Sequence, residues 1–98
     1  MIDSYDYGHT SQTGDQAMVY QLSAGEYRLN VCSYGGIILN LIVPDRDGRM
    51  ADVVLGLSDL GAYERSSTYM GVLIGRYANR IAGGTFSIND RTYQVPCN

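Results

Sequence analysis

The feature that most limits what this chain can fold into is the spacing of its apolar residues, which come in short runs broken by glycine-containing turns. One run alternates strictly, with the apolar residues Tyr27, Leu29 and Val31 at every second position. Between them stand the polar residues Arg28 and Asn30, and such alternation is typical of a strand with one buried face. With 12 glycines and 9 tyrosines in 98 residues, the whole chain favours β-structure joined by tight turns.

Three further stretches are predicted to be strands. Residues 17–22 precede the alternating run across a compact Ser23-Ala24-Gly25 turn, which predicts a hairpin. Residues 37–43 are apolar at almost every position, as in a strand covered on both faces, and a buried amide at Asn40 would need hydrogen-bond partners there. Residues 52–57 form another short strand.

A helical turn and a second hairpin complete the predicted elements. Residues 58–64 are expected to form one helical turn with Ser58 as its N-cap. Near the C-terminus, two strand-like stretches flank the two-residue turn Asn89-Asp90. In that register Phe86 opposes Tyr93, and we interpret the pair as packing residues rather than as a platform for a sugar.

The chain is too short for more than one domain. Residues 1–16 are polar and are predicted to be a loose N-terminal arm that ends in a first short strand, followed by a β-domain over residues 17–98. The single histidine, His9, lies in this arm without a second ligand nearby, so we expect a solvated side chain and no metal site. The chain stops at Pro96-Cys97-Asn98 without a capping or polar tail, which predicts that it is a piece of a longer protein.

Charge and targeting signals exclude several classes of partner. The net charge is −3 and the seven basic residues, all arginines, are scattered, which argues against nucleic acid. The N-terminus resembles no signal peptide and the longest apolar run is too short to cross a bilayer, so we expect a cytoplasmic protein without a membrane partner. Cys32 and Cys97 fit no metal or redox motif; a disulfide and free thiols are the alternatives, and buried free thiols are favoured because nothing indicates secretion.

The most informative stretch for function is residues 71–84, where an apolar run leads into Arg76, Asn79 and Arg80 before two glycines. Arginine offers a planar set of charged donors for oxygen-rich ligands, and asparagine offers both a donor and an acceptor, which suits a sugar hydroxyl. The alternative is that the arginines only pair with carboxylates. Spacing alone favours that alternative.

Five stretches in order resemble the aldose 1-epimerase (galactose mutarotase) family over about residues 18–98. They are Tyr34-Gly35-Gly36, Val43-Pro44-Asp45-Arg46-Asp47-Gly48, Asp52-Val53-Val54-Leu55-Gly56, Gly75-Arg76-Tyr77-Ala78-Asn79-Arg80-Ile81 and Tyr93-Gln94-Val95. The fourth is the most specific. The chain departs from the family at the Asn89-Asp90 turn, which bears only on the turn type. The resemblance implies an all-β fold, an antiparallel β-sandwich of the galactose mutarotase-like type, of which this chain is the N-terminal part.

The resemblance also implies a function. Members of this family are isomerases of carbohydrate metabolism that interconvert the α and β anomers of aldohexoses such as galactose and glucose. A base takes the proton of the anomeric hydroxyl, an acid protonates the ring oxygen, and no cofactor is needed. Asn79 and Arg80 match the family's sugar-binding pair, whereas Arg76 matches a position without an assigned contact and is expected to pair structurally.

The family's catalytic groups have no counterpart in this chain. Its two site histidines and its basic glutamate lie beyond the part that the chain resembles, and His9 cannot replace them. The chain therefore has no catalytic residue of its own and is expected to be inactive alone, with the C-terminal part of the sandwich as its partner. The alternatives are a non-catalytic carbohydrate-binding piece and a structural remnant of the fold.

Overall fold

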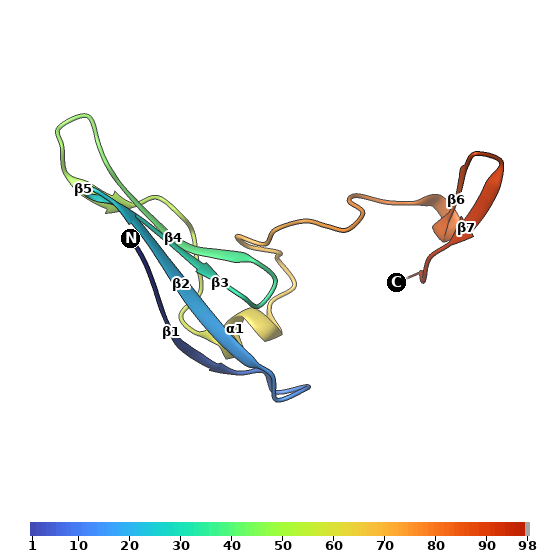
Figure 1. The fold of residues 1–98 in the computed structure, drawn as a ribbon, viewed down its shortest axis with the longest axis horizontal. Helices are drawn as coiled ribbons and strands as arrows, with labels where there is room; N and C mark the ends of the chain where they lie inside the picture. Colours follow the sequence, from blue (N-terminus) through green and yellow to red (C-terminus); the bar gives the residue numbers. More distant parts are fainter. Residues whose placement is uncertain (98) are drawn as a thin grey trace.

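A computed structural model describes residues 1–97 of the chain, and the last residue of the Pro96-Cys97-Asn98 end lies outside the described residues. Five strands form one antiparallel sheet in the order β1-β2-β3-β4-β5, and two more form a separate hairpin, β6-β7 (Figure 1). The elements in chain order are β1 (Ile2–His9), β2 (Gln16–Ala24), β3 (Tyr27–Cys32), β4 (Ile37–Pro44), β5 (Met50–Asp52), the helix α1 (Leu60–Arg65), the 3-10 turn η1 (Ala82–Gly84), β6 (Thr85–Ile88) and β7 (Arg91–Gln94).

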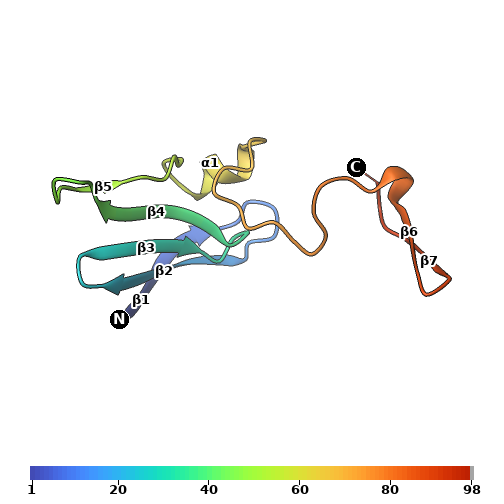
Figure 2. The ribbon, with the colours of Figure 1, turned by 90° about the horizontal axis from the view of Figure 1, so that it is seen from above.

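The two sheets do not pack on each other. In both views the β6-β7 hairpin lies well away from the five-stranded sheet, at the end of an extended segment that follows α1 (Figures 1 and 2). The described chain is correspondingly elongated, with extents of 54 × 35 × 24 Å. No helix within residues 1–97 is long and apolar enough to cross a membrane.

The prediction of a loose N-terminal arm is wrong, because most of it forms β1. This strand pairs with β2 from Ile2 opposite Leu22 to His9 opposite Gln16, with a bulge near Gly8. The ammonium group of Met1 also donates to the carbonyl of Ser23 at 2.9 Å. Polar composition misled the prediction, since an edge strand is held by backbone pairing and can keep polar side chains in water. His9 is exposed as expected, although it stands in a strand.

The first predicted hairpin is confirmed as β2-β3, but its buried face is the opposite of the expected one. Ala24 pairs with Tyr27, so the turn residues are Gly25 and Glu26 rather than residues 23–25. Asn30 and Cys32 are buried at 8% and 1% exposure, whereas Tyr27 is 54% exposed. Alternation separates two faces of a strand, but it does not say which face another element will cover.

The element that decides the buried face is α1. Its residues Leu60 and Tyr63 are buried in one cluster with sheet residues from β2, β3 and β4. The sheet members of this cluster are Ala17, Val19, Cys32, Ile37 and Leu39. Ile38 points to the other face and is 39% exposed, so the prediction that this strand is covered on both faces is wrong.

The helix starts one residue later than predicted and uses a different cap. Asp59, rather than Ser58, is the N-cap, and its carboxylate accepts a hydrogen bond from the N–H of Ala62 at 2.8 Å. The predicted strand over residues 52–57 is wrong except at Asp52, because β5 spans Met50–Asp52. The carboxylate of Asp52 accepts the N–H of Leu41 at 3.0 Å and that of Val54 at 3.1 Å, which replaces strand pairing at this point.

A chain of side-chain hydrogen bonds crosses the sheet, and it supplies the partners that Asn40 was predicted to need. The amide of Gln21 donates to Asn30 at 3.0 Å, and Asn30 donates to Asn40 at 3.0 Å. Asn40 then donates to the carboxylate of Asp52 at 2.7 Å. These four side chains, which we call the amide ladder, link β2, β3, β4 and β5 in the observed register.

The second hairpin has the predicted turn and the predicted register. Ile88 pairs with Arg91, and Phe86 pairs with Tyr93. The rings of Phe86 and Tyr93 are stacked at a centroid distance of 5.5 Å. The turn residues Asn89 and Asp90 have φ values of 48° and 61°. Two positive φ values in succession match the right-handed twist of the flanking strands, and asparagine and aspartate tolerate them.

Both cysteines are free. Cys32 is buried as predicted, but Cys97 is exposed, so the prediction of a buried thiol is wrong at that position.

Candidate functional site

The stretch that the sequence singled out, residues 71–84, leaves the sheet and leads to the second hairpin. Its start is anchored on the sheet by two backbone hydrogen bonds, from Ile38 N–H to the Gly71 carbonyl at 2.9 Å and from Leu73 N–H to the Gly35 carbonyl at 3.3 Å. A Cβ at Gly71 would come within 2.5 Å of the Ile38 carbonyl oxygen, so this contact requires glycine.

The end of the stretch is fixed on the hairpin in the same way. The Gly84 carbonyl accepts the N–H of Val95 at 2.8 Å. A Cβ at Gly84 would lie 2.5 Å from the Val95 carbonyl oxygen and 3.0 Å from the Cys97 sulfur. Glycine therefore permits the close approach that holds Val95 and Cys97 beside η1.

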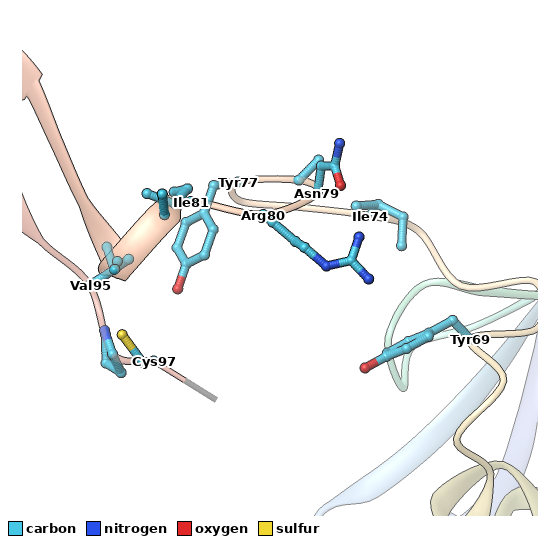
Figure 3. A pocket seen from close by; sticks show the side chains of 13 residues that line it. Tyr69, Ile74, Tyr77, Asn79, Arg80, Ile81, Val95 and Cys97 are labelled. Atoms are coloured by element: carbon cyan, nitrogen blue, oxygen red, sulfur yellow. The ribbon is translucent and has the colours of Figure 1, made fainter.

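Between these two anchors the chain borders an open cavity of about 750 Å³. Asn79 and Arg80 line it, together with two exposed tyrosines, Tyr69 and Tyr77. Figure 3 shows the guanidinium of Arg80 reaching toward the Tyr69 side of this space, with Val95 and Cys97 on the opposite side. A cavity of this size with a few polar groups and aromatic walls can hold a small molecule.

The structure does not support the alternative that the arginines of this stretch pair with carboxylates. Within residues 1–97 the one ion pair joins Arg46 Nε to Asp47 Oδ2 at 4.0 Å, far along the chain from the cavity. Arg76 was expected to pair structurally, and within the described residues that prediction is wrong. Arg76 is exposed and does not line the cavity, whereas Arg80 is exposed and does.

Asn79 has a backbone role as well as an amide. Its φ is 60°, in the left-handed region that glycine, asparagine and aspartate occupy more readily than other residues. The residue type at this position therefore has two physical explanations, the backbone turn and a contact to a ligand. They can be separated by substitution with glycine, which keeps the turn and removes the amide.

The sequence model of the aldose 1-epimerase family matches residues 18–98. This chain belongs to the aldose 1-epimerase family. Galactose mutarotase of Homo sapiens is 39% identical over 92 residues, which is 94% of this chain and 27% of that protein. A probable aldose 1-epimerase of Arthroderma benhamiae is 39% identical over 84 residues, covering 82% of this chain and 19% of that protein.

A solved structure supports the fold. Galactose 1-epimerase from Lactobacillus acidophilus NCFM superposes with a TM-score of 0.71 at 18% identity, covering 100% of this chain and 28% of that chain. The all-β, antiparallel fold of the family's N-terminal part is thereby confirmed. The chain spans about a quarter of the length of the curated galactose mutarotases that it matches.

The structure brings Asn79 and Arg80 to one cavity but does not test whether they touch a sugar, so that assignment stays a prediction. Sequence reasoning missed Tyr69 and Tyr77 as lining residues. Tyr77 could have been found, because it stands inside the Gly-Arg-Tyr-Ala-Asn-Arg-Ile stretch itself. Tyr69 carries no such local signal, since it reaches the cavity only through the path of the chain after α1.

Proposed function

We propose that this chain serves as the N-terminal part of an enzyme that interconverts the α and β anomers of aldohexoses such as galactose and glucose. One observation carries this proposal: the residues that match the family's sugar-binding pair, Asn79 and Arg80, both border the cavity of about 750 Å³. Neither is tied to a carboxylate within the described residues, so the guanidinium of Arg80 is free to donate to sugar oxygens.

In this proposal the two residues orient the sugar and do not transfer protons. Arginine stays protonated at physiological pH, and an amide has no suitable pKa, so neither side chain is a general acid or base. Orientation still matters, because holding a reactant in one geometry removes part of the entropic barrier. Proton transfer to the ring oxygen and from the anomeric hydroxyl would need two further groups, and no cofactor is proposed.

The single histidine of the chain does not lie at the cavity. His9 stands at the end of β1 and is not among the lining residues. A positioned acid or base typically contributes about 10²–10⁴-fold to a rate, so a chain without either keeps little catalysis. We therefore propose that the 98-residue chain binds an aldohexose weakly and does not accelerate its mutarotation when it is alone.

Polarimetry on freshly dissolved α-galactose and α-glucose tests the catalytic part. The purified 98-residue chain is expected to leave the buffer rate unchanged, while human galactose mutarotase in a parallel sample serves as the positive control. The protein isolated from cells that carry the gene is measured by intact mass and by the same assay. A mass several-fold above 10.8 kDa together with fast mutarotation is the expected result.

Saturation-transfer NMR with galactose tests the binding part. Arg80→Ala and Asn79→Gly are expected to weaken the signal on the sugar protons, because both remove donors while the glycine keeps the backbone turn. Arg46→Ala is the matched control, since Arg46 is an exposed arginine outside the cavity. Equal signals from all four proteins, or rapid mutarotation by the 98-residue chain, would contradict the proposal.

A further inference from the structure

Two residues that line the candidate site have a backbone conformation that is unusual for residues other than glycine. Within residues 1–97, four residues other than glycine have a positive φ: Tyr69 (54°), Asn79 (60°), Asn89 (48°) and Asp90 (61°). The last two form the β6-β7 turn, where the twist of the hairpin requires such values. The other two are ten positions apart in the sequence and line the same cavity.

Tyr69 is the unusual member of this group. Asparagine and aspartate tolerate the left-handed region, but for a bulky aromatic residue a positive φ is a genuine outlier. Its carbonyl accepts the N–H of Val72 at 3.3 Å, a turn that glycine would make without strain. The side chain is 74% exposed, so burial in the core does not compensate for the strained backbone.

Neither turn formation nor packing explains why a tyrosine stands at this position. Strained residues of this kind concentrate at binding and catalytic sites, where the surrounding structure holds them for a purpose. Tyr69 also borders a smaller cavity of about 370 Å³ beside α1, but the lining of that cavity includes no arginine or asparagine. Glu64 and Ser66 in that lining can form hydrogen bonds. Of the two cavities, however, the large one places the ring together with Asn79 and Arg80.

The chemistry of Arg80 and Tyr69 is complementary. Figure 3 shows the guanidinium of Arg80 extending toward the side of the space on which the ring of Tyr69 lies. A pyranose has hydroxyl groups around its rim and an apolar C–H face whose hydrogens carry partial positive charge. The negative face of an aromatic ring attracts such hydrogens, while charged donors bind the rim oxygens.

We propose that Tyr69 is a sugar-contacting residue whose ring stacks on the C–H face of the aldohexose that Asn79 and Arg80 bind. This inference rests on the function proposed above and adds a residue to the same site. Hydrogen bonds to the rim hydroxyls hold the sugar within the plane of its ring, and stacking on the ring of Tyr69 restricts its movement perpendicular to that plane. The tyrosine hydroxyl plays no part in it.

The first test measures galactose affinity by NMR titration of the 98-residue chain. Tyr69→Ala is expected to raise the Kd about tenfold, equivalent to about 1.4 kcal/mol, whereas Tyr69→Phe keeps the ring and restores wild-type affinity. Tyr27→Ala is the matched control, because Tyr27 is an exposed tyrosine on the sheet that does not line this cavity. Loss of affinity in Tyr69→Phe equal to that in Tyr69→Ala would overturn stacking.

The second test separates a binding role from a structural one through stability. Tyr69→Gly and Tyr69→Ala both remove the ring, but only alanine keeps the steric strain at φ 54°. We expect Tyr69→Gly to unfold at a higher urea concentration than Tyr69→Ala while both lose the same affinity. If both variants are less stable than the wild type and bind galactose normally, Tyr69 is structural and the inference is wrong.

The outcomes also distinguish this inference from the proposed function. If the wild-type chain shows no saturation-transfer signal on galactose, the proposed sugar binding and the proposed role of Tyr69 both fail. If the wild-type chain binds, Arg80→Ala weakens binding and Tyr69→Ala does not, then only the role of Tyr69 fails.

Discussion

The amide ladder gives the sharpest prediction about stability, and its central member is Asn30. This side chain is 8% exposed, accepts from Gln21 at 3.0 Å and donates to Asn40 at 3.0 Å. Substitution of Asn30 by alanine removes both hydrogen bonds at once. It also leaves one donor on Gln21 and one acceptor on Asn40 without their partner.

The expected magnitude follows from these two bonds. A neutral intramolecular hydrogen bond contributes about 0.5–1.5 kcal/mol net, so the pair accounts for about 1–3 kcal/mol. Gln21 and Asn40 are only half-buried, and Asn40 keeps its bond to Asp52 at 2.7 Å, so water can restore part of the loss. We therefore expect Asn30→Ala to lower the free energy of unfolding by about 2 kcal/mol.

Urea unfolding of the 98-residue chain, followed by circular dichroism, measures this change. With a slope of about 1 kcal/mol/M for a small protein, the midpoint should fall by about 2 M. Ser87→Ala is the control, because it removes an exposed hydroxyl contact to Thr92 at 3.2 Å and should change stability by less than about 0.5 kcal/mol. A double-mutant cycle with Gln21→Ala should give a coupling of about 1 kcal/mol.

The reasoning is refuted if Asn30→Ala and Ser87→Ala destabilise equally, or if the cycle with Gln21 shows no coupling. Either result would mean that the ladder forms in the folded chain without contributing to its stability. Unchanged slopes in all variants are required for the comparison, since a changed slope would report a different unfolded or folded state.

Two further predictions concern titration and thiol reactivity. The hydrogen bond from Asn40, together with those from the N–H groups of Val54 and Leu41, lowers the pKa of Asp52 below its usual value of 3.8. The ionised carboxylate therefore stabilises the fold above pH 3.8, and the urea midpoint of the chain should fall as the pH drops below that value. In Asp52→Asn this fall should be less steep. Burial raises the pKa of the Cys32 thiol, whereas Cys97 is exposed, so brief maleimide treatment of the folded chain should add one label, at Cys97, by mass spectrometry. Two labels at equal rates would contradict the buried position of Cys32.

Local signals in the sequence were sufficient where the structure is decided locally. The Asn89-Asp90 turn sets the register of β6-β7, because few residues other than asparagine, aspartate and glycine accept two positive φ values in succession. Asn40 was correctly expected to need partners, because a buried amide without them is costly. Neither conclusion required knowledge of the rest of the fold.

The errors have a common physical cause, which is dependence on distant parts of the chain. Whether β3 buries Asn30 or Leu29 depends on the position of α1, about thirty residues later. Whether residues 2–9 form a strand depends on the free edge of β2, not on their own polar composition. β5 ends early because the Asp52 side chain takes the N–H groups of Leu41 and Val54.

At the candidate site, too, a local signal identified some residues and the path of the chain decided another. Asn79 and Arg80 were identified from a short motif, whereas Tyr69 could not be, because it enters the cavity through the course of the chain between α1 and the sheet anchor at Gly71. A motif records which residue types a site needs at fixed spacing. It does not record an aromatic residue outside the motif, such as Tyr69 in the coil after α1, that lines the same cavity.

The exposed face of the sheet indicates where a second layer could pack and restrict the geometry of the candidate site. Opposite α1, the side chains of Tyr20, Leu22 and Ile38 remain exposed, and adjoining apolar side chains of this kind are typical of surfaces that another layer covers. The far wall of the cavity is formed by η1 and by residues 95–97, which flank the β6-β7 hairpin and stand away from this sheet (Figure 2). In a β-sandwich a second sheet packs on the first and fixes such outlying strands against it. A second layer of this kind would cover the exposed face and restrict the separation of Arg80 and Tyr69, so we expect it to strengthen the weak sugar binding proposed for the chain alone.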